Sequence, residues 1–310
     1  MDARTPAKAW PFFLLLAACV SSHALEFDKE FGEASFKFLK LPLSPRIVGL
    51  GGSGVALADG AGEIDLNPAS SAADSSGALI VGKGYPFAEF QANSSHITWS
   101  IPSGGYRILL NARYLGFDDL PGFSEQDKTT SKYGAHTLKA QAGVAGVLHN
   151  LYWGATLGYA GNSIANANYS SGMISAGARY IILPGLVAGA SAVNADFWDS
   201  KAKDANNRDP FPPTALQAGL AYSHSLGANF EAAAEVDART RNDEQMVWPA
   251  GLELAWKKVL FARAGFPFGE QEPGLAAGLG LRWSMFQFQY AYQSHETLSP
   301  AHYWSLDIRY

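Results

Sequence analysis

Hydrophobic and polar residues alternate along much of the chain after position 77. In the last stretch the apolar side chains fall on one face and the polar ones on the other: Trp304, Leu306, Ile308 and Tyr310 against Ser305, Asp307 and Arg309. The stretches 230–237, 251–256 and 286–293 repeat this pattern. A period of two residues indicates β-strands that have one apolar and one polar face.

The alternation divides residues 78–310 into about 14 strand segments, most of about 8 to 11 residues, which is the length that a tilted membrane strand needs. They begin near Ala78, His96, Tyr106, Thr137, Tyr152, Gly172, Leu186, Thr214, Ala228, Trp248, Val259, Gly274, Met285 and His302. The connections alternate in length. Short ones lie at 103–105, 149–151, 184–185, 225–227, 257–258 and 284, and long ones at 117–133, 161–171, 196–213, 238–247, 267–273 and 293–301.

This regular order of connections distinguishes between two kinds of β-protein. Short turns on one side and long loops on the other are typical of an outer-membrane barrel, with the short turns in the periplasm. A soluble β-sandwich also has alternating strands, but it has no reason to keep that order. The chain also closes an alternating strand with the aromatic residue Tyr310. We therefore predict an all-β protein, a transmembrane antiparallel β-barrel of about 14 strands over residues 78–310.

Residues 1–24 have the character of a signal peptide. Two basic residues precede the apolar run 10–20, which is too short to span a bilayer, and small residues follow it. Cleavage after Ala24 is the first choice. Leu16 to Cys19 also fits a lipoprotein cleavage site, and a cytoplasmic protein with an apolar start is a third alternative. Because an exported β-barrel is typical of outer membranes, we predict that the protein lies in the outer membrane of a Gram-negative-type bacterium.

The composition changes this picture little. The chain has 310 residues, a net charge of -5 and 16% charged residues. No basic stripe marks a nucleic-acid site. The predicted barrel makes outer-membrane lipid the expected partner. Cys19 is the single cysteine, and cleavage after Ala24 leaves no thiol for a disulfide or a metal site.

A helix-start signal stands in front of the strands. Asn67 can cap the first free N–H groups, and Pro68 with Ala69 suits the first turn. A barrel of about 14 strands encloses more space than its own side chains fill. We therefore predict that residues 25–77 form a short helical plug, in which Gly51 and Gly52 pack closely against the wall. The alternative is an ordinary capped surface helix.

Candidate chemistry is sparse. Seven histidines form no HExxH motif, and His224 and Ser225 would point to opposite faces of a strand, so they cannot form a catalytic pair. No enzyme activity, cofactor or metal is expected. Six charged residues fall on the polar faces of strands: Arg107, Arg113, Glu231, Glu235, Glu253 and Arg282. They form either a polar network against the plug or the lining of a gated pathway.

The segment 36–70, FKFLKLPLSPRIVGLGGSGVALADGAGEIDLNPAS, resembles the N-terminal signature of the PorV/PorQ family of outer-membrane proteins. The matching positions are Phe38, Leu39, Pro42, Ser44, Arg46, Leu50, Gly51, Gly52, Ala56, Ala58, Asp59, Asn67, Pro68 and Ala69. The stretch 113–123 is similar to the PorQ branch. The resemblance implies a FadL-like barrel of 14 strands with an N-terminal hatch, and it implies an association with type IX secretion.

Two functions remain. As a PorV/PorQ-like accessory of protein secretion and surface attachment, the protein would bind secretion-system subunits or secreted cargo. As a FadL-type channel, it would pass hydrophobic small molecules. The resemblance favours the first function, and neighbouring secretion genes would distinguish the two.

Overall fold

The computed structural model describes residues 34–57, 60–74, 76–86, 92–120, 133–164, 167–198, 209–271 and 274–310. The predicted signal peptide, with Cys19 and Ala24, lies outside the described residues. The same holds for Ala58 and Asp59 of the segment 36–70 and for most of the connections 117–133 and 196–213.

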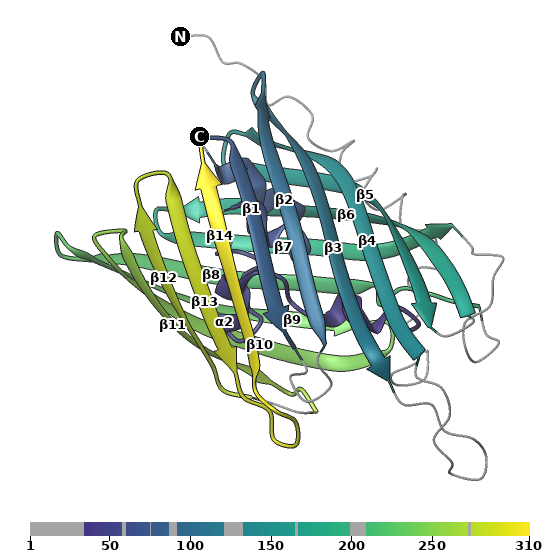
Figure 1. Cartoon of the computed structure of the whole chain (residues 1–310). Helices are drawn as coiled ribbons and strands as arrows, with labels where there is room; N and C mark the ends of the chain where they lie inside the picture. Colours follow the sequence, from purple (N-terminus) through teal and green to yellow (C-terminus); the bar gives the residue numbers. More distant parts are fainter. Residues whose placement is uncertain are drawn as a thin grey trace.

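Fourteen antiparallel strands form a closed barrel in which each strand pairs with its neighbours in sequence and β1 pairs with β14 (Figure 1). The strands are β1 Ala78–Tyr85, β2 Asn93–Ser103, β3 Tyr106–Leu120, β4 Tyr133–Leu148, β5 Leu151–Ile164, β6 Ala167–Leu183, β7 Leu186–Trp198, β8 Ala215–Leu226, β9 Phe230–Arg241, β10 Glu244–Trp256, β11 Leu260–Phe268, β12 Ala276–Trp283, β13 Phe286–Gln293 and β14 Ala301–Arg309. The predicted fold class is confirmed.

Two of the predicted long loops are wrong. Most of 161–171 belongs to β5 and β6, which pair as far as Ile164 with Ala167. The stretch 238–247 continues β9 and β10, which turn at Asn242 and Asp243. Neighbouring strands pair beyond the segments that alternation marked, because the backbone N–H and C=O groups of adjacent strands bond one another there. The strands therefore range up to the 17 residues of β6.

The two faces of the wall differ as the alternation predicts. On β10, Leu252 and Leu254 are exposed on the outside while Glu253 between them is buried. The outer surface carries large exposed hydrophobic side chains on nearly every strand, and most of the buried wall side chains are polar or charged. An apolar exterior around a polar interior is the arrangement of a barrel that spans a membrane.

Short helices lie inside the barrel (Figure 1). They are η2 Lys37–Lys40, α2 Pro45–Gly49, η3 Ala61–Glu63 and η4 Pro68–Ala73. α2 contacts β11 to β14, and η4 contacts β3 to β6 on the other side of the lumen. Among the described residues, no helix has the length and apolar character needed to cross a bilayer. The segment 34–77 is called the plug below.

Candidate functional site: the plug and the lumen wall

The Asn-Pro-Ala stretch begins η4, a 3-10 helix. Asn67 caps it, because its Oδ1 accepts a hydrogen bond from the backbone N–H of Ala69 at 3.0 Å. Its Nδ2 donates to the carbonyl oxygen of Val55 in the plug and of Ala178 on β6, at 2.8 and 3.3 Å. Asn67 is fully buried. One side chain thus starts the helix, ties two parts of the plug together and fixes them to the wall.

Glycines bring the plug backbone into contact with the wall. Gly51 has a φ of +68°, and a Cβ there would lie 2.3 Å from the backbone nitrogen of Phe266 on β11. The wall also contributes glycines that the sequence did not single out. A Cβ on Gly154, Gly177 or Gly189 would lie within 2.4 Å of Pro68, Asn67 or Val55, respectively. Larger side chains at these wall positions would displace the plug.

β9 holds the plug through two carboxylates. Glu235 accepts hydrogen bonds from the backbone N–H groups of Ala56 and Leu57, at 2.6 and 3.1 Å. Asp237 accepts from Gly54 and Val55, at 2.8 and 3.2 Å. Four consecutive plug amides are therefore bound by two side chains that lie two residues apart on one strand.

A buried ion cluster fixes α2. Nε and Nη2 of Arg46 donate to the two carboxylate oxygens of Glu253 on β10, at 3.0 and 2.9 Å. Arg263 on β11 donates to the same carboxylate at 2.6 Å. Two guanidinium groups around one carboxylate compensate the buried charge of Glu253. Arg46 was predicted in the plug and Glu253 on the lumen wall, and the structure brings them together.

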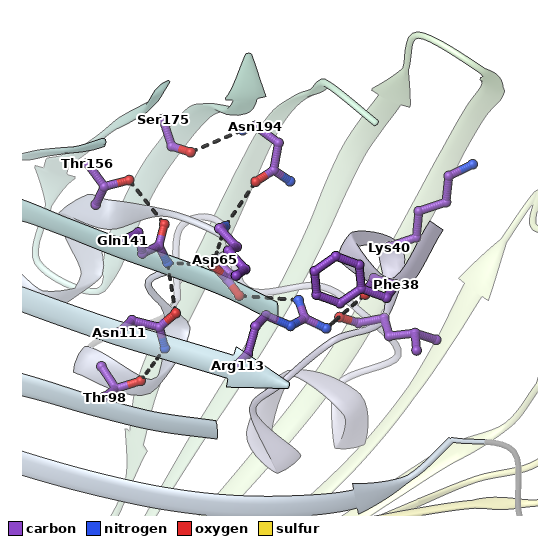
Figure 2. A network of polar contacts seen from close by, with 12 residues as sticks. Phe38, Lys40, Asp65, Thr98, Asn111, Arg113, Gln141, Thr156, Ser175 and Asn194 are labelled. Atoms are coloured by element: carbon purple, nitrogen blue, oxygen red, sulfur yellow. Dashed lines mark hydrogen bonds and ion pairs between the residues drawn. The ribbon is translucent and has the colours of Figure 1, made fainter. Parts of the chain in front are cut away.

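A second polar cluster surrounds Asp65 (Figure 2). Lys139 and Gln141 of β4 donate to its Oδ1 at 2.7 and 2.6 Å, and Arg113 of β3 reaches its Oδ2 at 3.3 Å. Burial of Asp65 opposes its ionisation, but the charges of Lys139 and Arg113 outweigh this and lower the pKa of Asp65 to about 2. Arg113 also donates to the carbonyl oxygens of Phe38 and Leu41.

The remaining sequence-predicted residues lie nearer the barrel end that carries the short turns. Arg107 donates to the carbonyl oxygens of Ser76 and Asp74. Glu231 pairs with Lys258 at 3.4 Å, and Arg282 donates to Gln287. Sequence reasoning missed Lys139, Gln141 and Asp237 as plug ligands and Arg263 as a partner of Glu253, although alternation does place them on inward faces.

Between the plug and the wall, the described residues line a turn-side and a loop-side cavity. The turn-side cavity, about 280 Å³, reaches Lys258 in the β10–β11 turn and Arg309 at the end of β14. The loop-side cavity, about 190 Å³, reaches Pro86, Glu270 and His295, beyond the opposite ends of β1, β11 and β13. Among the described residues, His, Asp and Glu side chains form no group that could hold a metal ion.

Comparison of the sequence with models of known families and with curated proteins finds no match. Solved structures of similar fold exist. The toluene transporter TodX of P. putida superposes with a TM-score of 0.62, at 12% identity over 87% of this chain and 99% of that chain. The toluene transporter TbuX of Ralstonia pickettii gives 0.57, at 12% identity over 86% of this chain and 98% of that chain.

A FadL homologue of Pseudomonas aeruginosa gives a TM-score of 0.51, at 10% identity over 86% of this chain and 98% of that chain. At these identities the likeness concerns the fold alone. The chain has a FadL-like fold of the outer-membrane barrels, a closed 14-stranded barrel with a short helical N-terminal region.

Proposed function

We propose that the protein is a non-enzymatic channel of the outer membrane that admits small apolar molecules from outside. The observation that carries this proposal is the apolar lining that the plug gives to the loop-side cavity: Leu39, Leu41, Pro42, Leu43, Ile47 and Val48. Ligand sites are commonly concave and lined by apolar side chains with a few polar groups. An apolar solute that enters gains about 25 cal/mol per Å² of surface removed from water.

The apolar surface continues from this cavity along the inner wall. Phe36, Phe38 and Leu39 of the plug form one buried cluster with Tyr169 and Met173 of β6. This cluster contrasts with the mainly polar inner wall and supports a route for an apolar solute. The FadL-like fold, which this chain shares with two toluene transporters, supports a monoaromatic hydrocarbon as the first solute to test.

The second candidate is a PorV/PorQ-like accessory of type IX secretion. Its support is the resemblance of the segment 36–70. In the structure this segment is the plug, and its most recognisable residues contact the wall: Arg46, Gly51 and Asn67. Packing inside a barrel therefore accounts for these residues without a secretion partner, which is why we favour the channel.

Proteoliposomes test the channel function. With a toluene-oxidising enzyme trapped inside, the purified protein should raise product formation several-fold above protein-free liposomes. Leu43→Asn, which places an amide in the loop-side cavity, should weaken the binding of naphthalene, followed by its fluorescence. Leu57→Asn is the matched control, because Leu57 lies in the plug but lines the turn-side cavity.

Two results would contradict the channel function. One is a folded barrel that neither binds naphthalene nor passes toluene. The other is stable co-purification with secretion subunits or cargo from native outer membrane, together with absent toluene flux; this would favour the accessory role.

A further inference from the structure

The turn-side and loop-side cavities share only two lining residues among those that the structure describes, Gly62 and Glu63. Both belong to η3, a helix of one turn. On one side of η3 lies a cavity that reaches the short turns, and on the other side a cavity that reaches the long loops. Gly62 and Glu63 therefore form part of the partition between the two cavities.

A hydrogen bond joins η3 to α2. Ser44 Oγ donates to Glu63 Oε1 at 3.1 Å, and both residues are 5% exposed. The same Ser44 oxygen accepts from the backbone N–H of Arg46 and so caps α2. A hydroxyl that must serve both contacts holds the first turn of α2 and the Glu63 carboxylate in one place.

The other side of η3 is closed by the barrel wall. A Cβ on Gly62 would lie 3.4 Å from Cδ1 of Ile80 on β1, which is ordinary contact distance. A Cβ on Gly60 would lie 3.2 Å from Glu63 Oε2, so the carboxylate is packed against the backbone of its own loop. The partition thus runs from β1 through η3 to α2, and the polar contact between Ser44 and Glu63 joins η3 to α2 within it.

We propose that the Ser44–Glu63 contact is the gate of the lumen, and that a solute or ion passes between the two cavities only when the Glu63 side chain leaves Ser44. This inference rests on the proposed function only for the solute that uses the path. The opening itself requires no loss of the Arg46–Glu253 pair and no departure of the plug.

The charged side chains that line the turn-side cavity predict the ion selectivity of the opened path. Six cationic side chains line the turn-side cavity: Arg46, Arg179, Lys258, Arg263, Arg282 and Arg309. Five carboxylates oppose them: Glu63, Asp74, Glu231, Glu253 and Asp307. Removing Glu63 leaves six cations against four carboxylates, so an opened path should favour chloride over potassium.

Conductance in planar bilayers tests the gate with the full chain. Glu63→Ala should conduct in KCl where the wild type is nearly silent, and a KCl gradient should give a reversal potential of chloride-preferring sign. Glu63→Gln, which keeps the shape and accepts from Ser44, should stay closed. Glu231→Ala is the matched control: it removes a carboxylate from the same cavity, yet Glu231 lies beside Lys258 near the short turns and not in the partition.

A cysteine variant tests whether ions pass through the lumen at position 63. Glu63→Cys should conduct like Glu63→Ala and should lose conductance when a bulky thiol-specific reagent is added. The wild type with reagent controls for Cys19, the only other cysteine. Each variant is first required to run faster on gels unheated than boiled, as a folded barrel does.

The outcomes separate the gate from the proposed function. The gate is overturned if the Glu63→Ala variant folds as a barrel but does not conduct ions, or if Glu63→Ala and Glu231→Ala conduct equally. Either result overturns it even if toluene passes through the wild type. Chloride-preferring conductance in Glu63→Ala supports the gate even if no form of the protein passes toluene, and only the solute is then wrong.

Discussion

The two ends of the plug are held to the wall by different chemistry. At α2, Arg46 enters a buried ion cluster with Glu253 and Arg263. At η4, the neutral Asn67 and the close approach to Gly154 and Gly177 hold the helix against β5 and β6. A buried ion cluster is costly to break from one side only, whereas a neutral contact through glycine depends on shape. The two ends should therefore respond differently to small changes.

Removing the plug should have the largest effect, since both ends are then lost together. Deletion of 34–77 should leave a barrel that still assembles, because strand pairing closes it without the plug. That barrel should conduct ions strongly in a planar bilayer, while the intact protein is nearly silent. Equal, low conductance from the two forms would mean that the outer loops close the lumen.

Glu253→Ala should weaken the α2 end most. It leaves Arg46 and Arg263 buried without their shared carboxylate, at a cost of about 3–5 kcal/mol. Protease sensitivity and hydrogen exchange of the plug should increase while the barrel stays folded.

Glu231→Ala is the control for that experiment. Its partner Lys258 has a side chain 73% exposed, so the exposed pair contributes little. If protease sensitivity and hydrogen exchange of the plug rise equally in Glu231→Ala and Glu253→Ala, the ion cluster has no special role in holding the plug.

Gly177→Val should disturb the η4 end by shape alone. The first added carbon would lie 2.0 Å from Asn67 Oδ1, so the plug or the strand must shift, at about 1–3 kcal/mol for overpacking. Hydrogen exchange at residues 67–73 should rise more than at 45–49. Gly161→Val on β5 is the control, because the nearest atom to its Cβ, on Tyr159, is 3.6 Å away.

Asn67→Ala should have a smaller effect than Glu253→Ala, because it removes neutral hydrogen bonds of about 1 kcal/mol each and leaves no buried charge without its partner. Brief open events should become more frequent in bilayer recordings, and Pro68→Gly should act in the same direction by loosening the helix start. An effect as large as that of Glu253→Ala would mean that the two ends of the plug are held equally strongly.

The sequence predicted the barrel because its signals are local. Leu252, Glu253 and Leu254 show in three residues which face meets lipid and which meets the lumen. Strand ends are less local. The predicted loops 161–171 and 238–247 became strand because a partner strand was available to bond them, which no single segment records.

The contacts of the plug depend on residues far apart along the chain. Alternation placed Glu253 inside the lumen, and the Asn67-Pro68-Ala69 pattern marked the start of η4. By itself, the sequence thus determined the two faces of the wall and the helix start. Only the tertiary structure brought Glu253 to Arg46, 207 positions away, and set Gly177 against Asn67. Barrel closure fixes these pairs, because it decides which inward side chains lie opposite each turn of the plug.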